Sequence, residues 1–96
     1  MIIQIVRFKS GLSDEKVLKM YKARAPQYRA LPGLKQKYYL RFPETGEHGA
    51  VYLWESETDI KAFRQSELGR TISSAYQVEG TPKVEHAELV MMPHQE

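Results

Sequence analysis

The chain has 96 residues, a length that supports one domain with a thin hydrophobic core, and we expect a single domain over residues 1–96. Its 14 basic and 12 acidic residues leave a formal net charge of +2, which is too small to indicate a nucleic-acid or anionic-membrane partner. The absence of cysteine excludes disulfides, thiolate catalysis and cysteine metal sites, and no apolar run is long enough to span a membrane. Residues 1–4 lead into a strand and not into a signal peptide, so we expect a cytoplasmic protein.

The first half of the chain predicts a strand, a helix and a second strand. Residues 2–8 carry bulky apolar side chains at both alternating sets of positions, which is typical of a central strand covered on both faces. Ser13 is a suitable N-cap for the helix that follows, and Pro26 predicts a kink or a restart in it. Residues 34–42 alternate as a second strand. One of its faces carries Leu34, Gln36, Tyr38, Leu40 and Phe42, and the other carries Lys35, Lys37, Tyr39 and Arg41.

The second half predicts a strand that leads straight into a helix. The strand covers residues 49–54, and the helix begins after the N-cap Ser56 and extends to about Leu68. A further short helix is expected over 70–77. A Gly-Thr-Pro turn then precedes a last strand over 83–92.

The predicted order β-α-β-β-α-β is that of the ferredoxin-like α+β fold, an antiparallel four-stranded sheet with helices on one face. The first, third and fourth strands carry large apolar side chains on both faces. Because the face without helices cannot be left in water, we expect it to pack on a second copy of the chain. The pattern therefore predicts a homodimer formed through the sheet face.

Three segments carry a resemblance to a known family. They are residues 31–34, with the sequence Leu-Pro-Gly-Leu, residues 49–56 and residues 62–67. Together they are similar to the dimeric α+β-barrel superfamily, in particular the antibiotic-biosynthesis-monooxygenase-like and YdhR-like proteins. The resemblance implies a homodimer with one pocket per subunit between sheet and helices, and cofactor-independent oxygenation of a phenol-like or polycyclic aromatic substrate. Many of these relatives place a histidine where Phe63 stands, so a histidine-based site is not carried over at that position.

Aromatic residues are the candidates for holding such a substrate. Trp54 lies where the third strand meets its helix, and with Tyr52 and Tyr38 it is expected to form a wall for a flat ring. Tyr28 and Tyr76, on the inward faces of their helices, are expected to close the same cavity. The full set of candidate substrate-binding residues is Trp54, Tyr52, Tyr38, Tyr28, Phe63 and Tyr76. The alternative for each is ordinary packing in the core or in a dimer interface.

His86 is the candidate catalytic residue, as a general base that removes a phenol proton. Its alternative is a hydrogen-bonded interface histidine, because nothing pairs it in sequence with a second acid or base. His48 and His94 are expected to be solvated. Three arginines at inward or sheet positions are candidates for clamping a carboxylate or an oxyanion, with salt bridges as the commoner outcome. They are Arg7, Arg24 and Arg41.

Neither a metal nor an organic cofactor is expected, because the histidines are scattered and no glycine-rich phosphate loop or nucleophile elbow occurs. An RNA-recognition module has the same element order, but residues 2–6 lack the stacking aromatic that such modules carry. Two functions remain. One is a cofactor-free oxygenase acting on a small aromatic molecule, with a cavity that His86 or an arginine reaches. The other is a non-catalytic dimeric protein that binds a small molecule in the same cavity.

Overall fold

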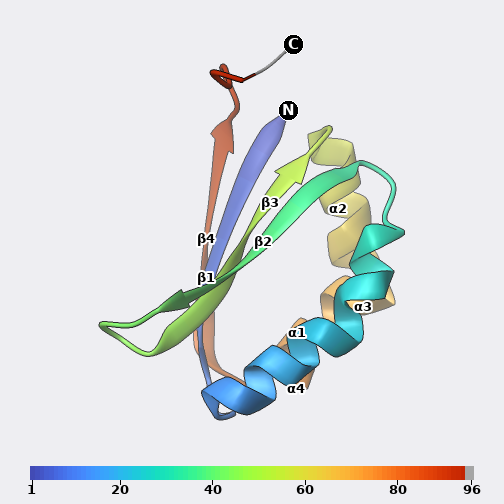
Figure 1. Cartoon of the computed structure of the whole chain (residues 1–96). Coiled ribbons are helices and arrows are strands. Elements are labelled where there is room, and N and C mark those ends of the chain that lie inside the picture. The colour runs from blue at the N-terminus through green and yellow to red at the C-terminus, as the bar shows by residue number, and fades with distance from the viewer. Residues whose placement is uncertain (95–96) are drawn as a thin grey trace.

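A four-stranded antiparallel sheet with helices on one face forms the structure, for which a computed structural model describes residues 1–94 (Figure 1). The strand order is β2-β3-β1-β4. This order is that of the ferredoxin-like α+β fold, so the predicted fold class is confirmed. In chain order the elements are β1 (Ile2–Ser10), α1 (Asp14–Arg29), β2 (Leu34–Phe42), β3 (Glu47–Trp54), α2 (Glu57–Gln65), α3 (Glu67–Arg70), α4 (Ile72–Ala75) and β4 (Val78–Glu88).

The two long helices begin where serine caps were predicted. The Ser13 hydroxyl accepts a hydrogen bond from the Lys16 amide at 3.3 Å, and the Ser56 hydroxyl accepts one from the Asp59 amide at 3.4 Å. The expected restart at Pro26 does not occur, and α1 continues to Arg29. Pro26 lies in the last turn, where the loss of its own N–H removes a single helical hydrogen bond. None of the helices in residues 1–94 combines the length and the apolar character needed to cross a membrane.

The helix after β3 ends earlier than predicted, and the reason is Ser66. Its backbone N–H bonds to the carbonyls of Ala62 and Phe63, which closes α2. Its hydroxyl then accepts from the Gly69 amide at 3.2 Å and starts α3. One serine is thus both the C-cap of α2 and the N-cap of α3. The short helix predicted over 70–77 is present as α4, which is limited to Ile72–Ala75.

The last strand is also shifted from its predicted position, since β4 covers Val78–Glu88 and not 83–92. Gly80 has a φ of 70° and lies within the strand instead of in a turn. There the pairing of β4 with β1 changes register between Arg7 and Lys9, which is the geometry of a β-bulge. Within one copy of the chain, β4 is an edge strand with mostly exposed side chains.

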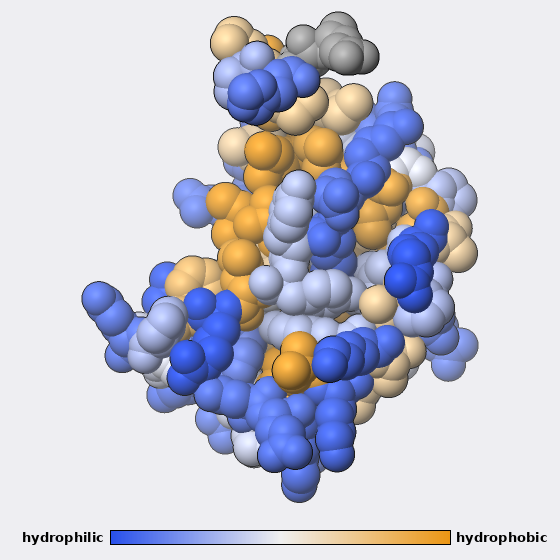
Figure 2. All heavy atoms as spheres, in the orientation of Figure 1, coloured by the Kyte–Doolittle hydropathy of each residue, from blue (hydrophilic) through white to orange (hydrophobic). Residues whose placement is uncertain are grey.

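The core lies between the sheet and the helices. Its largest fully buried side chains are Trp54 from β3, Ile60 from α2 and Val17 from α1. No helix of residues 1–94 covers the opposite face of the sheet, and the apolar side chains of that face are half-buried or exposed. They are Ile3, Ile5, Tyr38, Leu40, Phe42, Val51 and Leu53. Figure 2 shows apolar atoms exposed over the strands.

Candidate functional site

A cavity of about 290 Å³ lies between the helix-facing side of the sheet and the helices. Its volume is at the lower end of the range for small-molecule sites. Most of its lining is apolar or aromatic, with a small number of polar groups. The sheet supplies Gln4, Val6, Phe8, Lys37, Ala50, Tyr52, Pro82 and Val84, and the helices and their junctions supply Tyr28, Phe63, Arg64, Gly69, Ile72, Ser73 and Tyr76.

The structure brings four of the six candidate substrate-binding residues together on this cavity. Tyr28, Tyr52 and Phe63 form a cluster, with ring centroids 5.7 Å apart for Tyr28–Phe63 and 5.9 Å apart for Tyr52–Phe63. Tyr76 lines the same cavity, and its buried hydroxyl has no hydrogen-bond partner among residues 1–94. A buried hydroxyl without a partner is costly unless a ligand or water satisfies it.

Trp54 does not line the cavity but supports its wall from behind. It is 0% exposed, and its ring stacks on Tyr52 with centroids 5.8 Å apart and planes 10° apart. Its indole Nε1 donates a hydrogen bond of 2.9 Å to the Oε1 of Gln4. Because that bond engages the carbonyl oxygen of Gln4, the amide NH₂ of Gln4 is the group left to donate into the cavity.

Tyr38 and His86 lie outside the cavity. Tyr38 is opposite Val51 on the face of the sheet without helices and is 59% exposed, so it does not join the wall expected with Trp54 and Tyr52. His86 is opposite Gln4 and thus on the helix-facing side of β4, but it is exposed and lines a separate surface depression near Glu55.

His48 is not solvated, contrary to expectation. It points to the helix side of β3, is 4% exposed and packs beside Phe8. Its Nε2 lies 3.0 Å from Oδ1 of Asp14, although the alignment is not that of a hydrogen bond and neither ring nitrogen has a partner in residues 1–94. The prediction failed because the hairpin turn is shorter than assumed, so His48 falls inside the strand. His94 is exposed, as expected.

Two of the three candidate arginines form salt bridges on the surface. Arg7 pairs with Glu47 at 2.8 Å, and Arg41 pairs with Asp14 at 2.9 Å. Arg24 is held inside by hydrogen bonds to the Leu68 carbonyl and the Thr71 hydroxyl, while its Nε is buried and has no partner among the described residues. The arginine that lines the cavity is Arg64, which the sequence did not single out.

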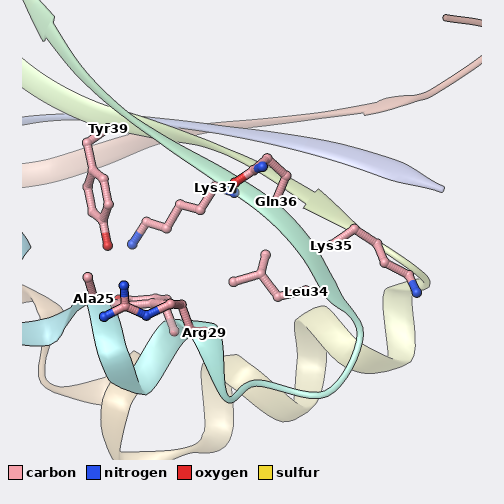
Figure 3. Close-up of a pocket in the computed structure, with 8 residues that line it drawn as sticks. Ala25, Arg29, Leu34, Lys35, Gln36, Lys37 and Tyr39 are labelled. Carbon is pink, nitrogen blue, oxygen red and sulfur yellow. Dashed lines mark hydrogen bonds between the residues drawn. The ribbon is translucent and has the colours of Figure 1, made fainter. Parts of the chain in front are cut away.

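Lys37 is the functional candidate that the sequence analysis missed. It lies opposite Tyr52 on the helix side of β2, and its Nζ is 3.2 Å from the ring centroid of Tyr28, 4.5 Å from that of Tyr39 and 4.6 Å from that of Tyr52. The residue as a whole is half-buried because β2 is an edge strand, but its amine lies among these rings. Figure 3 shows the side chain extending from β2 toward α1.

The protonation states in the cavity follow from burial. Burial, with a smaller contribution from the charge of Arg24, lowers the pKa of Lys37 to about 6. The three tyrosine rings favour the ammonium form and act against this shift. Burial raises the pKa values of the Tyr28, Tyr52 and Tyr76 hydroxyls, so they remain neutral hydrogen-bond donors near neutral pH. The cavity thus combines phenolic donors with an amine that titrates within the physiological range.

The described part of the chain contains no candidate metal site. No group of three or more His, Asp or Glu side chains there is placed to hold a metal ion.

Solved structures of other proteins share this fold over nearly the whole chain. NE2512 of Nitrosomonas europaea, a protein of unknown function, superposes with a TM-score of 0.78 at 15% identity over 99% of this chain and 94% of that one. SnoaB, a cofactor-independent oxygenase from Streptomyces nogalater, gives 0.77 at 10% identity over 98% of this chain and 97% of its own. An antibiotic biosynthesis monooxygenase gives 0.75 at 13% identity over 95% and 100%.

At the level of sequence, no protein-family model and no curated protein matches the chain. The structural likenesses, all at low identity, show that the chain has the fold of the antibiotic-biosynthesis-monooxygenase-like proteins. The resemblance read from the sequence is confirmed at that level.

Proposed function

We propose that this protein, which has the fold of the antibiotic biosynthesis monooxygenases, is a cofactor-independent monooxygenase for a small phenol- or quinol-like aromatic molecule. The cavity between sheet and helices is the proposed substrate site. A homodimer located in the cytoplasm is part of the same proposal.

The observation that carries the proposal is the lining of the cavity. Tyr28, Tyr52 and Phe63 present ring surfaces to a space of about 290 Å³, which suits a flat substrate of one to three rings better than a flexible chain. The unpartnered Tyr76 hydroxyl is a ready partner for a polar substituent on such a ring. Gln4 offers a second donor.

The proposed reaction needs no external reductant. A quinol, or an anthrone with a reactive CH₂ group, loses two hydrogens and gains one oxygen atom, while the other oxygen atom of O₂ leaves with those hydrogens as water. All four electrons that reduce O₂ come from the substrate. The chain must therefore bind the ring, exclude bulk water and remove a proton, because the deprotonated ring gives up an electron more readily than the neutral one.

A second candidate function is binding without turnover. The fold hosts different activities, and His86, the base expected from the sequence, does not reach the cavity. On this alternative the same aromatic lining retains a small hydrophobic molecule, and no oxygen is consumed.

The test is a titration of the Trp54 fluorescence with phenols, quinols and anthrones, followed by oxygen uptake with each ligand that binds. Trp54 is the only tryptophan and contacts the cavity through Tyr52, so binding is expected to quench it saturably. Tyr76→Phe is expected to weaken phenol binding by about 2- to 10-fold through the loss of one hydrogen bond. Tyr38→Phe, on the other face of the sheet, is the matched control with unchanged affinity. Saturable quenching without oxygen uptake would favour the binding protein, and no quenching would refute both functions.

The dimer is proposed from the sheet face without helices. Ile3, Ile5, Val51 and Leu53 form the centre of an apolar surface that one copy of the chain leaves uncovered (Figure 2). Sedimentation at micromolar concentration is expected to show a dimer. Val51→Glu is expected to raise the dimer dissociation constant by about 100-fold or more, because it buries an unpaired charge. Leu18→Glu, on the exposed side of α1, is expected to leave the dimer intact, and a monomeric wild-type protein would contradict the proposed interface.

A further inference from the structure

We infer that Lys37 is the proton acceptor of the cavity: its neutral amine takes the proton from the hydroxyl of a bound phenol or quinol, and the resulting ammonium holds the phenolate against the tyrosine rings. This inference rests on the ligand class given in the proposed function, but it does not require that the bound ligand be oxygenated.

The position of the amine is the first argument. Nζ of Lys37 lies against the face of Tyr28, 3.2 Å from its ring centroid, with Tyr52 and Tyr39 at 4.6 and 4.5 Å. Both Tyr28 and Tyr52 line the cavity together with Lys37. A ring that stacks on this cluster therefore brings its hydroxyl within reach of the amine. His86 has no such position, because it lines a different depression.

The charges around the amine are the second argument. From α1, Arg24 and Arg29 face this region, and from α2 Arg64 lines the cavity. Lys35 of β2 lines the cleft beside α1 and pairs with Glu55 at 2.9 Å. The remaining titratable neighbours are the tyrosines of α1, β2, β3 and the α4–β4 junction. No aspartate or glutamate lines the cavity within the described residues, and none forms a salt bridge with Lys37. A lysine beside arginines and without a carboxylate is poised to be neutral, and the same positive surroundings stabilise the phenolate that forms.

Lys37 also has a route by which its proton can reach solvent. A cleft of about 350 Å³ lies between α1 and β2, and Lys37 and Tyr28 line both this cleft and the cavity. Figure 3 shows Lys37 in the cleft, with Ala25 and Arg29 of α1 on the other side. The amine thus stands at the boundary between the two spaces. It can take a proton from a bound ligand on one side, keep it while the phenolate is bound, and return it to water on the other side once the phenolate has reacted or left.

The step is a simple proton transfer. The ligand O–H bond breaks, its electron pair stays on the oxygen, and the proton forms a new N–H bond on Lys37, so charge is conserved within the complex. In the proposed oxygenation the phenolate is then the species that reacts with O₂.

The test uses 4-nitrophenol, whose anion has a strong visible absorbance band that the neutral phenol lacks, and it involves no oxygen chemistry. At a pH above the midpoint of Lys37 titration and below the pKa of the free phenol, the wild-type complex is expected to absorb as phenolate without releasing a proton to the buffer. Lys37→Met is expected to lose at least about 90% of that band, since no acceptor remains. His86→Ala is the matched control and is expected to keep the whole band.

Lys37→Arg distinguishes between two possible roles of Lys37, that of a proton acceptor and that of a fixed positive charge. Its guanidinium cannot accept a proton, so any phenolate that it binds is expected to release one proton per ligand to the buffer. Three results would overturn the inference: a phenolate band that survives in Lys37→Met, a proton released by the wild-type complex, or no binding of the phenol. A band without oxygen uptake by any quinol would refute the proposed oxygenase and leave Lys37 as the acceptor. Oxygenation that persists in Lys37→Met would refute Lys37 as the proton acceptor and leave the proposed oxygenase standing.

Discussion

Lys37→Met is expected to raise the free energy of unfolding, most strongly in acid. The pKa of Lys37 is about 6 in the folded chain, below its ordinary value of 10.5, so the unfolded chain binds the proton more tightly. Protonation therefore costs stability. The full cost is present below the folded pKa and is relieved as the pH rises from about 6 to 10.5, by up to about 1.4 kcal/mol per pH unit.

Methionine has a similar length and no charge, so the substitution removes this cost. The expected gain at pH values below the folded pKa is about 2 to 6 kcal/mol, the lower figure allowing for the cation–π contacts with Tyr28 and its neighbours. The gain is expected to shrink as the pH rises. Urea unfolding of both proteins across this pH range, at one fixed protein concentration, measures it. Lys61→Met, on the exposed side of α2, is the control, and parallel stability curves for Lys37→Met and the wild type would contradict the buried amine.

Trp54→Ala is expected to lower the free energy of unfolding by about 3 to 5 kcal/mol. The side chain is 0% exposed, it stacks on Tyr52 and packs on Phe63, and its N–H bonds to Gln4. Trp54→Phe keeps most of the volume but leaves the Gln4 carbonyl without its donor, so a smaller loss of about 1 to 3 kcal/mol is expected.

Circular dichroism during urea unfolding is the suitable measurement, because the variants lack the fluorescent residue. Leu18→Ala removes an apolar side chain that is 52% exposed and serves as the control, with an expected loss below about 1 kcal/mol. A Trp54→Ala protein as stable as Leu18→Ala would show that the wall behind the cavity is not part of the core.

The fold was predictable because its signals are local. Ser13 and Ser56 each precede a helix and cap it as expected, and the apolar character of both faces of β1 identified a central strand. The errors in the element boundaries lie at residues that can take either of two structural roles. Ser66 both ends α2 and begins α3, and Gly80 forms a bulge inside β4 where a turn was expected. Residue propensity alone does not decide between the two roles, because serine suits both the end of one helix and the start of the next, and glycine suits both a turn and a bulge.

The candidate site was predictable in part, and the errors come from the choice of strand face. Tyr28, Tyr52, Phe63 and Tyr76 are aromatic residues at inward positions, and hydrophobic periodicity finds such residues. On β2 the more apolar set of positions faces away from the helices. Hydrophobic periodicity therefore favours Tyr38 over Lys37 as a cavity residue, whereas the structure has the reverse. Hydropathy could not reveal this, because the second sheet face is apolar too.

A register count from the hairpin would have located Lys37. Phe42 lies opposite Glu47, and stepping back along both strands places Lys37 opposite Tyr52. The same count places His48 inside β3, opposite Arg41, where the structure has it buried.

In the proposed function, the cavity binds an aromatic substrate, and the chain promotes the reaction of that substrate with O₂ without a cofactor. The most direct measurement is a single-turnover reaction under ¹⁸O₂ with a quinol or anthrone that quenches Trp54, followed by mass spectrometry of the product. One ¹⁸O atom is expected in the product and the other in water, at a rate far above that of the protein-free solution. Saturable binding with no gain over the protein-free rate, or a product oxygen that comes from water, would contradict it.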